Sequence, residues 1–263
     1  MFLKTKEEIN WKDDSLHEDC PSLTPYFLKD KRKAPIIVVI PGGGYGHRAY
    51  HEGVPVAEWL NKNGYHAYVL RYNVAPIKDQ EVIYKSKYAI QYARYYAESK
   101  GIKGQKLGVL GFSAGGHLAA MISNDFDEAK EDSNDPVLRY TSRPDFHLLC
   151  YPVISMGDYT HEGSKNNLLG ENPEEALVLN HSCERLVTSQ TSPAFIWSTA
   201  NDQAVPVMNS LLYAQALQEH QIEYDLHIYQ DGRHGLGLAD DQFHTINWKE
   251  ECISWLDTYI KPS

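Results

Sequence analysis

Apolar and polar positions along the chain follow two periods, one typical of buried strands and the other of amphipathic helices. Continuous apolar runs over residues 34–40 and 107–112 predict strands that are buried on both faces. Further strands are predicted over 66–74, 145–154, 193–199 and 224–230, and helices over 52–62, 79–99, 115–123, 205–220 and 247–259. This alternation predicts an α/β fold, with a mostly parallel central sheet and helices on both faces.

Two stretches interrupt the alternation of strands and helices. Residues 124–144 are acidic and rich in Pro, Asn and Asp, so we expect a surface loop there, with calcium binding by the acidic run as the alternative. Residues 155–192 contain the run NPEE at 172–175, which is typical of a helix start. We expect one domain over residues 1–263, in which 155–192 is a small insertion near the carboxyl ends of the strands, as a cap over the active site.

Composition narrows the class of protein. The 263 residues carry 25 Lys and Arg against 35 Asp and Glu, a formal net charge of −10, so we expect no nucleic-acid partner. No apolar run reaches the roughly 18 residues of a membrane span, and the N-terminus has no apolar run of signal-peptide length. The four cysteines form no close pair. We therefore expect a cytoplasmic protein with no membrane partner, and we keep a homodimer as an open alternative.

One pentapeptide points to a nucleophile. Gly111-Phe112-Ser113-Ala114-Gly115 has the pattern G-x-S-x-G and joins a predicted strand to a predicted helix. A sharp turn in that position exposes the serine Oγ, and small neighbours let the backbone close. Ser113 is therefore the candidate nucleophile, and the N–H of Ala114 at the helix start is a candidate donor to negative charge. An incidental serine in a glycine-rich turn is the alternative.

A serine nucleophile of this kind needs an acid and then a histidine downstream. Asp202 follows the predicted strand at 193–199, and His234 follows the one at 224–230. Both positions lie where parallel strands end, which is where open α/β sheets place their sites. A helix cap for Asp202 and a surface histidine for His234 are the alternatives, and Asp231 is the second candidate for the acid.

A glycine run follows the first buried strand. Glycines let backbone N–H groups turn toward a substrate oxygen, so Gly43 and Gly44 are candidate oxyanion donors together with Ala114. A nucleotide-binding loop is the alternative. The third glycine of GxGxxG is missing and no Lys-Ser/Thr pair follows, so the sequence favours the oxyanion loop.

Several tyrosines and histidines near these motifs are candidates for binding roles. Tyr45, beside the glycine run, and Tyr151, at a predicted strand end, are candidate substrate contacts. His47 and His51 have the spacing of a helical metal pair, but no third ligand is evident nearby, so we expect neither a metal nor another cofactor. We expect His117 to face the packed side of its helix.

On these motifs the sequence resembles the α/β-hydrolase superfamily, and within it the esterase/lipase group with an HGGG-type oxyanion loop. The resemblance is closest to small bacterial acetylesterases of the acetyl-xylan-esterase-like, BD-FAE type. It rests on PGGGYGHRAYHEG, VLGFSAGGHLAA, NLLGENPEE, STANDQAVPV and GRHGLGL, which span most of residues 36–238. Pro41 stands where the HGGG pattern has histidine, which leaves the glycine donors intact but removes a side chain that braces the loop.

The resemblance implies a serine carboxylesterase without a cofactor, in which the serine, histidine and aspartate named above form a triad. It implies a small-molecule substrate, a short-chain and most simply an acetyl ester on a sugar or oligosaccharide. The polar character of residues 155–192 also favours a short acyl group. An arylformamidase-like amidase is the nearest alternative, and a catalytically inactive hydrolase-like binding protein is the alternative of a different class.

Overall fold

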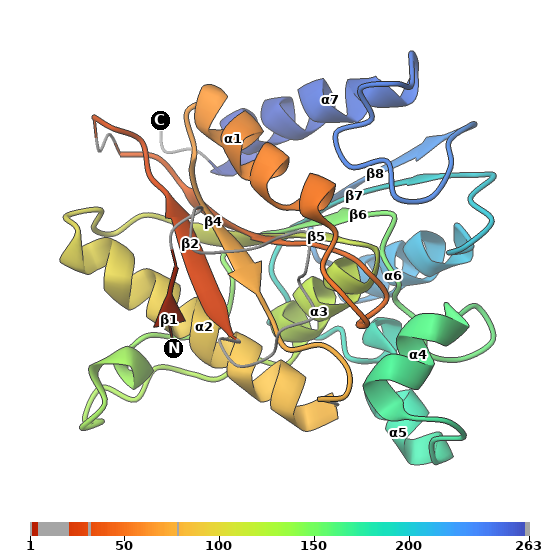
Figure 1. Cartoon of the computed structure of the whole chain (residues 1–263), viewed down its shortest axis with the longest axis horizontal. Helices are drawn as coiled ribbons and strands as arrows, with labels where there is room; N and C mark the ends of the chain where they lie inside the picture. Colours follow the sequence, from red (N-terminus) through yellow and green to blue (C-terminus); the bar gives the residue numbers. More distant parts are fainter. Residues whose placement is uncertain (1, 5–20, 31–32, 78, 261–263) are drawn as a thin grey trace.

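The computed structural model describes residues 2–4, 21–30, 33–77 and 79–260, which Figure 1 shows in colour. The strands of this part form one sheet in the order β1-β2-β4-β3-β5-β6-β7-β8. Among the described strands only the pair β2 and β4 is antiparallel. The bounds are β1 Phe2–Leu3, β2 Ser22–Tyr26, β3 Ile36–Ile40, β4 His66–Arg71, β5 Leu107–Phe112, β6 His147–Cys150, β7 Ala194–Thr199 and β8 Tyr224–Tyr229.

Helices cover both faces of the sheet, as the alternation predicted. One face packs against α1 (Val54–Lys62) and α7 (Trp248–Trp255), and the other against α2 (Asp79–Ser99), α3 (Ser113–Asn124) and α6 (Met208–Glu219) (Figure 1). Strand β3 consists of five β-branched residues, all of them buried, because it lies between these two helical layers. The remaining turns are the 3₁₀ helices Tyr50–Glu52, Pro136–Arg139, Cys183–Arg185 and Thr245–Asn247, and a π-helix at Leu256–Ile260.

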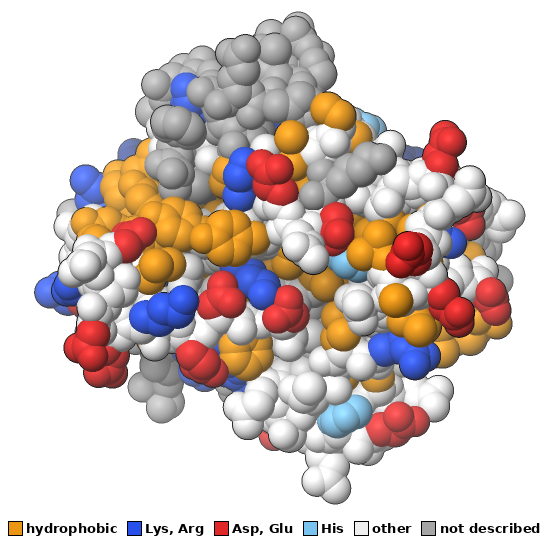
Figure 2. All heavy atoms as spheres, turned by 90° about the horizontal axis from the view of Figure 1, so that it is seen from below, with side chains coloured by type: hydrophobic (Ala, Val, Ile, Leu, Met, Phe, Trp, Pro, Cys, Tyr) orange, Lys and Arg blue, Asp and Glu red, His pale blue; other side chains and the backbone are white. Residues whose placement is uncertain are grey.

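Two stretches also interrupt the alternation of strands and helices in the structure. After α3 ends at Asn124, the chain forms a loop of mostly exposed and half-buried residues around the short helix Pro136–Arg139. Residues 155–192 carry α4 (Glu162–Leu169) and α5 (Glu175–Asn180), and α5 begins within the NPEE run. Figure 2 shows acidic and basic side chains interspersed over one face of the molecule.

The structure differs from the predicted elements mainly at their ends. The predicted strand at 145–154 is shortened to β6, because the chain turns at Tyr151, whose φ is +36°. The predicted helix at 205–220 begins only at Met208. Strand β2, which pairs antiparallel with β4, was not predicted. No helix in the described ranges is both long and apolar enough to cross a membrane.

Parallel strands bring their carboxyl ends to one edge of the sheet. Strands β3, β5, β6, β7 and β8 are mutually parallel through their neighbours, so the loops that follow them meet at that edge. The glycine run follows β3, the G-x-S-x-G serine follows β5, and the candidate acid and histidine follow β7 and β8. The topology therefore brings together residues that lie up to 121 positions apart in the chain.

Candidate active site

Ser113 lies in a sharp turn between β5 and α3. Its φ is +52°, a left-handed backbone conformation that residues other than glycine adopt rarely. The backbone in this turn leaves no room for a Cβ atom on either side of the serine, so the turn can close only because glycines flank it. A Cβ on Gly115 would lie 2.2 Å from the carbonyl oxygen of Ile40, and a Cβ on Gly111 would lie 2.2 Å from that of Gly115. The G-x-S-x-G spacing thus has a direct steric cause, and the turn holds Oγ at the edge of the sheet.

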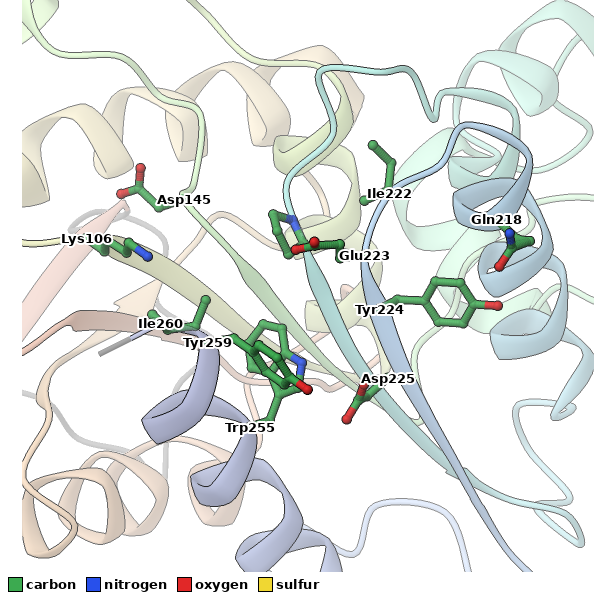
Figure 3. A pocket seen from close by; sticks show the side chains of 11 residues that line it. Lys106, Asp145, Gln218, Ile222, Glu223, Tyr224, Asp225, Trp255, Tyr259 and Ile260 are labelled. Carbon is green, nitrogen blue, oxygen red and sulfur yellow. The ribbon is translucent and has the colours of Figure 1, made fainter. Parts of the chain in front are cut away.

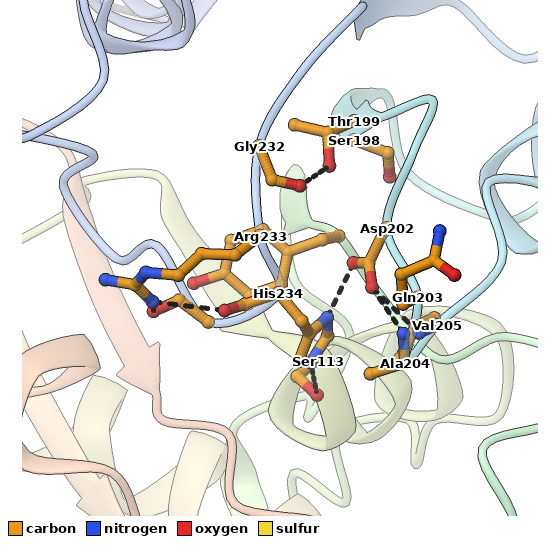
Figure 4. Close-up of polar contacts among 12 residues, drawn as sticks. Ser113, Ser198, Thr199, Asp202, Gln203, Ala204, Val205, Gly232, Arg233 and His234 are labelled. Carbon is orange, nitrogen blue, oxygen red and sulfur yellow. Dashed lines mark hydrogen bonds and ion pairs between the residues drawn. The ribbon is translucent and has the colours of Figure 1, made fainter.

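Ser113, His234 and Asp202 form one hydrogen-bonded line (Figure 4). His234 Nε2 lies 2.7 Å from Ser113 Oγ, and His234 Nδ1 lies 2.6 Å from Asp202 Oδ2. A carboxylate only accepts, so Nδ1 carries the proton and Nε2 of the neutral ring is free to accept the serine proton. This is the arrangement that activates a serine for attack on a carbonyl carbon.

Asp202 is held as an anion. Burial raises the pKa of this carboxyl group. Hydrogen bonds from His234 and from the backbone N–H groups of Val205 and Ala204 lower the pKa by more, so that it lies below its ordinary value. Oδ1 accepts the two N–H groups at 3.0 and 2.8 Å, while Oδ2 faces His234. One carboxylate therefore shapes its own loop and orients the imidazole. Asp231 accepts a hydrogen bond from Asn201 instead.

The backbone around the glycine run orients two N–H groups. Ala49 N–H donates to the Gly42 carbonyl at 3.0 Å, and Gly46 N–H donates to the Gly43 carbonyl at 3.0 Å. In a trans peptide the N–H points away from the C=O, so these bonds set the directions of the Gly43 and Gly44 N–H groups. A φ of +122° and a Cβ position only 2.4 Å from the His47 carbonyl oxygen require glycine at position 43, and a φ of +62° favours glycine at position 44.

The third candidate donor is oriented in the same way. Val153 N–H donates to the Ser113 carbonyl at 3.0 Å, which fixes the peptide that carries the Ala114 N–H. Within the described residues, none of the three candidate N–H groups donates to a protein acceptor. Preformed donors of this kind stabilise a developing oxyanion because they need no reorganisation during the reaction.

The two candidate substrate tyrosines lie elsewhere than expected. Tyr45 and Tyr151 were predicted to contact substrate, but their exposed fractions are only 1% and 2%. The Tyr45 hydroxyl lies 2.7 Å from Nδ1 of the buried His117, beneath the glycine run, and the Tyr151 ring packs edge-on against His234. Both correct our expectation, because a tyrosine at a strand end can turn inward and support the site from below. The expectation that His117 is packed is confirmed.

A cavity of about 430 Å³ opens over the serine. Residues from the insertion contribute to it: His161, Gly163 and Asn167 line it beside Ser113 and His234. The remaining lining residues are Gly43, Gly44, Gly46, His47, Ala49, His51, Glu52 and Gly235. Most of its lining residues are glycines and histidines, so the cavity offers several hydrogen-bonding groups and, among the described residues, no bulky aliphatic side chain. In the described part of the chain, no three His, Cys, Asp or Glu residues are grouped so as to hold a metal ion.

His161 presents a defined tautomer to this cavity. Its Nδ1 accepts the backbone N–H of Ser164 at 3.1 Å, so the proton of the neutral ring is on Nε2. Burial lowers the pKa of His161, and nearby His234 lowers it further, against smaller opposing effects of Asp202 and Glu162. No sequence pattern marks His161 as part of the site, because a histidine at a helix N-terminus in a polar segment is usually a surface residue.

A larger cavity, of about 680 Å³, lies at the opposite end of the sheet (Figure 3). Its lining includes residues that precede the parallel strands, among them Lys106, Asp145 and Glu223, together with Trp255 and Tyr259. None of the candidate site residues lines it. Size alone therefore does not locate the site; the aligned serine, histidine and aspartate do.

Comparison with known proteins agrees with this geometry. The BD-FAE family model matches residues 26–217. Endo-1,4-β-xylanase B of Butyrivibrio fibrisolvens is 36% identical over 92% of this chain and 39% of that protein. An acetylxylan esterase of Xylanibacter ruminicola is 34% identical over 94% of this chain and 50% of that protein, so the chain spans half or less of these two relatives.

A solved structure extends the likeness to the fold. The acetyl ester-xyloside bifunctional hydrolase of Caldicellulosiruptor lactoaceticus is 46% identical, with a TM-score of 0.89 over 95% of this chain and 93% of that one. The sheet order and the helical layers are those of the α/β-hydrolase fold. The chain therefore belongs to the BD-FAE family of α/β hydrolases.

Proposed function

We propose that this chain is a serine carboxylesterase that removes short acyl groups, acetyl above all, from a sugar or oligosaccharide. The observation that carries the proposal is the line from Ser113 through His234 to Asp202, with contacts of 2.7 and 2.6 Å, beside three oriented backbone donors.

The chemistry follows from the positions of these atoms. Ser113 Oγ attacks the ester carbonyl carbon while His234 Nε2 takes its proton. The carbonyl oxygen becomes an oxyanion held by the N–H groups of Gly43, Gly44 and Ala114. His234 then gives its proton to the alcohol oxygen as the C–O bond breaks. Water repeats the attack on the acyl-enzyme, which releases the acid and restores the serine.

Two observations support the choice of substrate. The similar proteins named above include an acetylxylan esterase and an acetyl ester-xyloside bifunctional hydrolase. The cavity over Ser113 is small, and among the described residues no Val, Leu, Ile, Met or Phe side chain lines it to bind a long acyl chain. Both favour a short acyl group on a hydrophilic alcohol.

Hydrolysis of p-nitrophenyl acetate by the wild type and by Ser113→Ala tests the proposal. We expect the wild type to turn over the ester and to be labelled by a fluorophosphonate at Ser113. We expect the variant to lose both while it keeps its thermal unfolding transition. A folded variant with wild-type turnover would contradict the assignment of the nucleophile, and an unlabelled, inactive wild type would favour the binding-protein alternative.

A substrate panel separates the enzyme classes. It compares p-nitrophenyl esters of increasing chain length with acetylated xylo-oligosaccharides and N-formylkynurenine. We expect the highest kcat/KM with acetyl groups, and release of acetate from the oligosaccharides. Rates that rise beyond butyrate would contradict the short-acyl proposal, and faster turnover of N-formylkynurenine would favour the arylformamidase alternative.

A further inference from the structure

Glu52 is a buried carboxylate among the loops of the active site. Its exposed fraction is 2%, and its two oxygens have different partners. Oε2 accepts the backbone N–H of Gly42 at 2.8 Å, and Oε1 accepts the hydroxyl of Tyr151 at 2.6 Å. A buried carboxylate is tolerated only where hydrogen bonds replace its hydration. Glu52 therefore depends on two loops, the one after β3 that carries Gly42 and the one after β6 that carries Tyr151.

Tyr151 carries the connection onward to the histidine. Its hydroxyl donates to Glu52 and accepts the backbone N–H of Gly237, at 2.7 Å. Gly237 lies three residues after His234, and the Tyr151 ring packs against the His234 ring with centroids 5.0 Å apart. Burial, and then the charge of Glu52, raises the pKa of Tyr151, so its hydroxyl remains a donor.

We propose that Glu52 and Tyr151 are positioning residues that hold the oxyanion loop and the histidine loop at a fixed separation. The inference rests on the proposed function, because it assigns these residues a role in the same reaction. It also explains how the loop is braced although Pro41 replaces the histidine of the HGGG pattern: the carboxylate binds the loop N–H from ten residues further along the chain.

Replacement of Glu52 by glutamine tests this role with little change in volume. An amide NH₂ cannot accept a hydrogen bond, so if the amide oxygen keeps the Gly42 N–H, the NH₂ faces the Tyr151 hydroxyl, whose own proton then loses its acceptor. With p-nitrophenyl acetate we expect kcat to fall about 10- to 100-fold, because displacement of catalytic groups by about 1 Å can cost that much. We expect KM to change by less than about threefold, because ground-state contacts remain.

A transition-state analogue gives a readout that a purely structural role would not move. A trifluoromethyl ketone adds to the serine and places an oxyanion among the backbone donors. Its Ki is expected to rise by the same factor by which kcat falls. Tyr151→Phe, which keeps the ring but removes the hydroxyl, is expected to act in the same direction. The double variant is expected to be no worse than the more severe single variant, because the two residues act as one hydrogen-bonded unit.

The chain offers a matched control away from the site. Tyr65 donates to Asp257 at 2.5 Å, which is the same pairing of a tyrosine with a carboxylate on the α1 and α7 side of the sheet. Tyr65→Phe is expected to lower the thermal unfolding temperature while kcat and Ki at 25 °C stay within about twofold of the wild type.

The outcomes separate this inference from the proposed function. If the wild type is active and Ser113→Ala is not, but folded Glu52→Gln has wild-type kcat and Ki, the positioning role alone is wrong. Effects confined to KM, or additive effects of the two substitutions, would overturn it as well. If Glu52→Gln does not fold, Tyr151→Phe decides by the same criteria. An inactive wild type would instead refute the proposed function.

Discussion

Asn167 donates a hydrogen bond from Nδ2 to the carbonyl oxygen of Gly44 at 2.8 Å, across 123 positions of the chain. The bond joins α4 of the insertion to the glycine loop that carries two of the proposed oxyanion donors. The insertion therefore does more than border the cavity: it contacts the loop from the solvent side, while Glu52 holds the same loop from the interior.

Loss of this bond should weaken catalysis modestly. Replacement of Asn167 by alanine leaves the Gly44 carbonyl to water, because the contact is only partly buried. We expect kcat/KM for p-nitrophenyl acetate to fall about 2- to 10-fold, the range of one net hydrogen bond. Asn166→Ala, at the exposed neighbouring position, is the control and should match the wild type. Equal activity of both variants would show that the loop keeps its shape without α4.

His161 should affect sugar esters more than activated esters. Its neutral ring has an Nε2–H with no acceptor among the described residues, and the side chain lines the cavity. We expect His161→Ala to lower kcat/KM for acetylated xylo-oligosaccharides about 3- to 10-fold, because a sugar hydroxyl loses a donor. p-Nitrophenyl acetate has no hydroxyl group to lose that donor, so it serves as the internal control. An equal decrease for both substrates would contradict a contact with the sugar.

Substitution of the two candidate acids should separate them clearly. Asp202→Asn places an amide against His234 Nδ1 and favours the wrong tautomer, so kcat is expected to fall about 10⁴-fold. Asp231→Asn changes a side chain that bonds to Asn201 and is expected to retain kcat within about threefold. Steady-state kinetics with p-nitrophenyl acetate measures both. The reverse ranking would make Asp231 the catalytic acid.

Buried histidines should make the fold sensitive to acid. Burial lowers the pKa of His147 to about 3, from 6.5, and the charge of Arg143 lowers it further. As the pH falls below 6.5 the unfolded chain takes up a proton at this residue, while the folded chain does not until about pH 3. Its contribution to the free energy of unfolding is therefore complete above that window and is lost within it, at about 1.4 kcal/mol per pH unit.

Urea unfolding at pH 6, 5 and 4 measures this dependence. His147 lies between Ser192 and Tyr213, away from the serine, so His147→Gln is a suitable comparison. We expect the free energy of unfolding to fall less steeply with decreasing pH in the variant than in the wild type, by the slope that corresponds to about one proton. His117, whose pKa burial also lowers to about 3, should keep part of the slope in both proteins. Identical slopes would show that His147 is protonated in the folded state.

The main elements of the fold could be predicted from local patterns. Continuous apolar runs such as Ile36–Ile40 are typical of strands covered on both faces, and the helical spacing between them predicts the crossover connections. Strand β2 lacked that signal, because its sequence SLTPY mixes polar and apolar residues and contains Pro25. Its pairing with β4 is visible only in the folded chain. Helix α4 could not be predicted either, because its mostly polar sequence has no apolar residues at helical spacing.

The triad was predictable for a similar reason. Ser113, Asp202 and His234 each follow a recognisable strand, and strand order places their loops at one edge. The support around them was not predictable. Glu52 looks like an ordinary charged residue near a helix start, and its burial depends on three loops that meet only in the folded chain. Cytoplasmic location and a homodimer stay predictions.

The oxyanion donors are main-chain atoms, and so are the groups that orient them. At Ala49 and Val153, every encoded residue except proline supplies the same N–H, so most substitutions at these two positions leave the bonds in place. These orienting bonds therefore tolerate most substitutions at the two positions, whereas substitution of His161 or Asn167 removes the contacts that these side chains make. Substitutions that accumulate among the cavity side chains would therefore change which ester binds before they changed how the ester is cleaved.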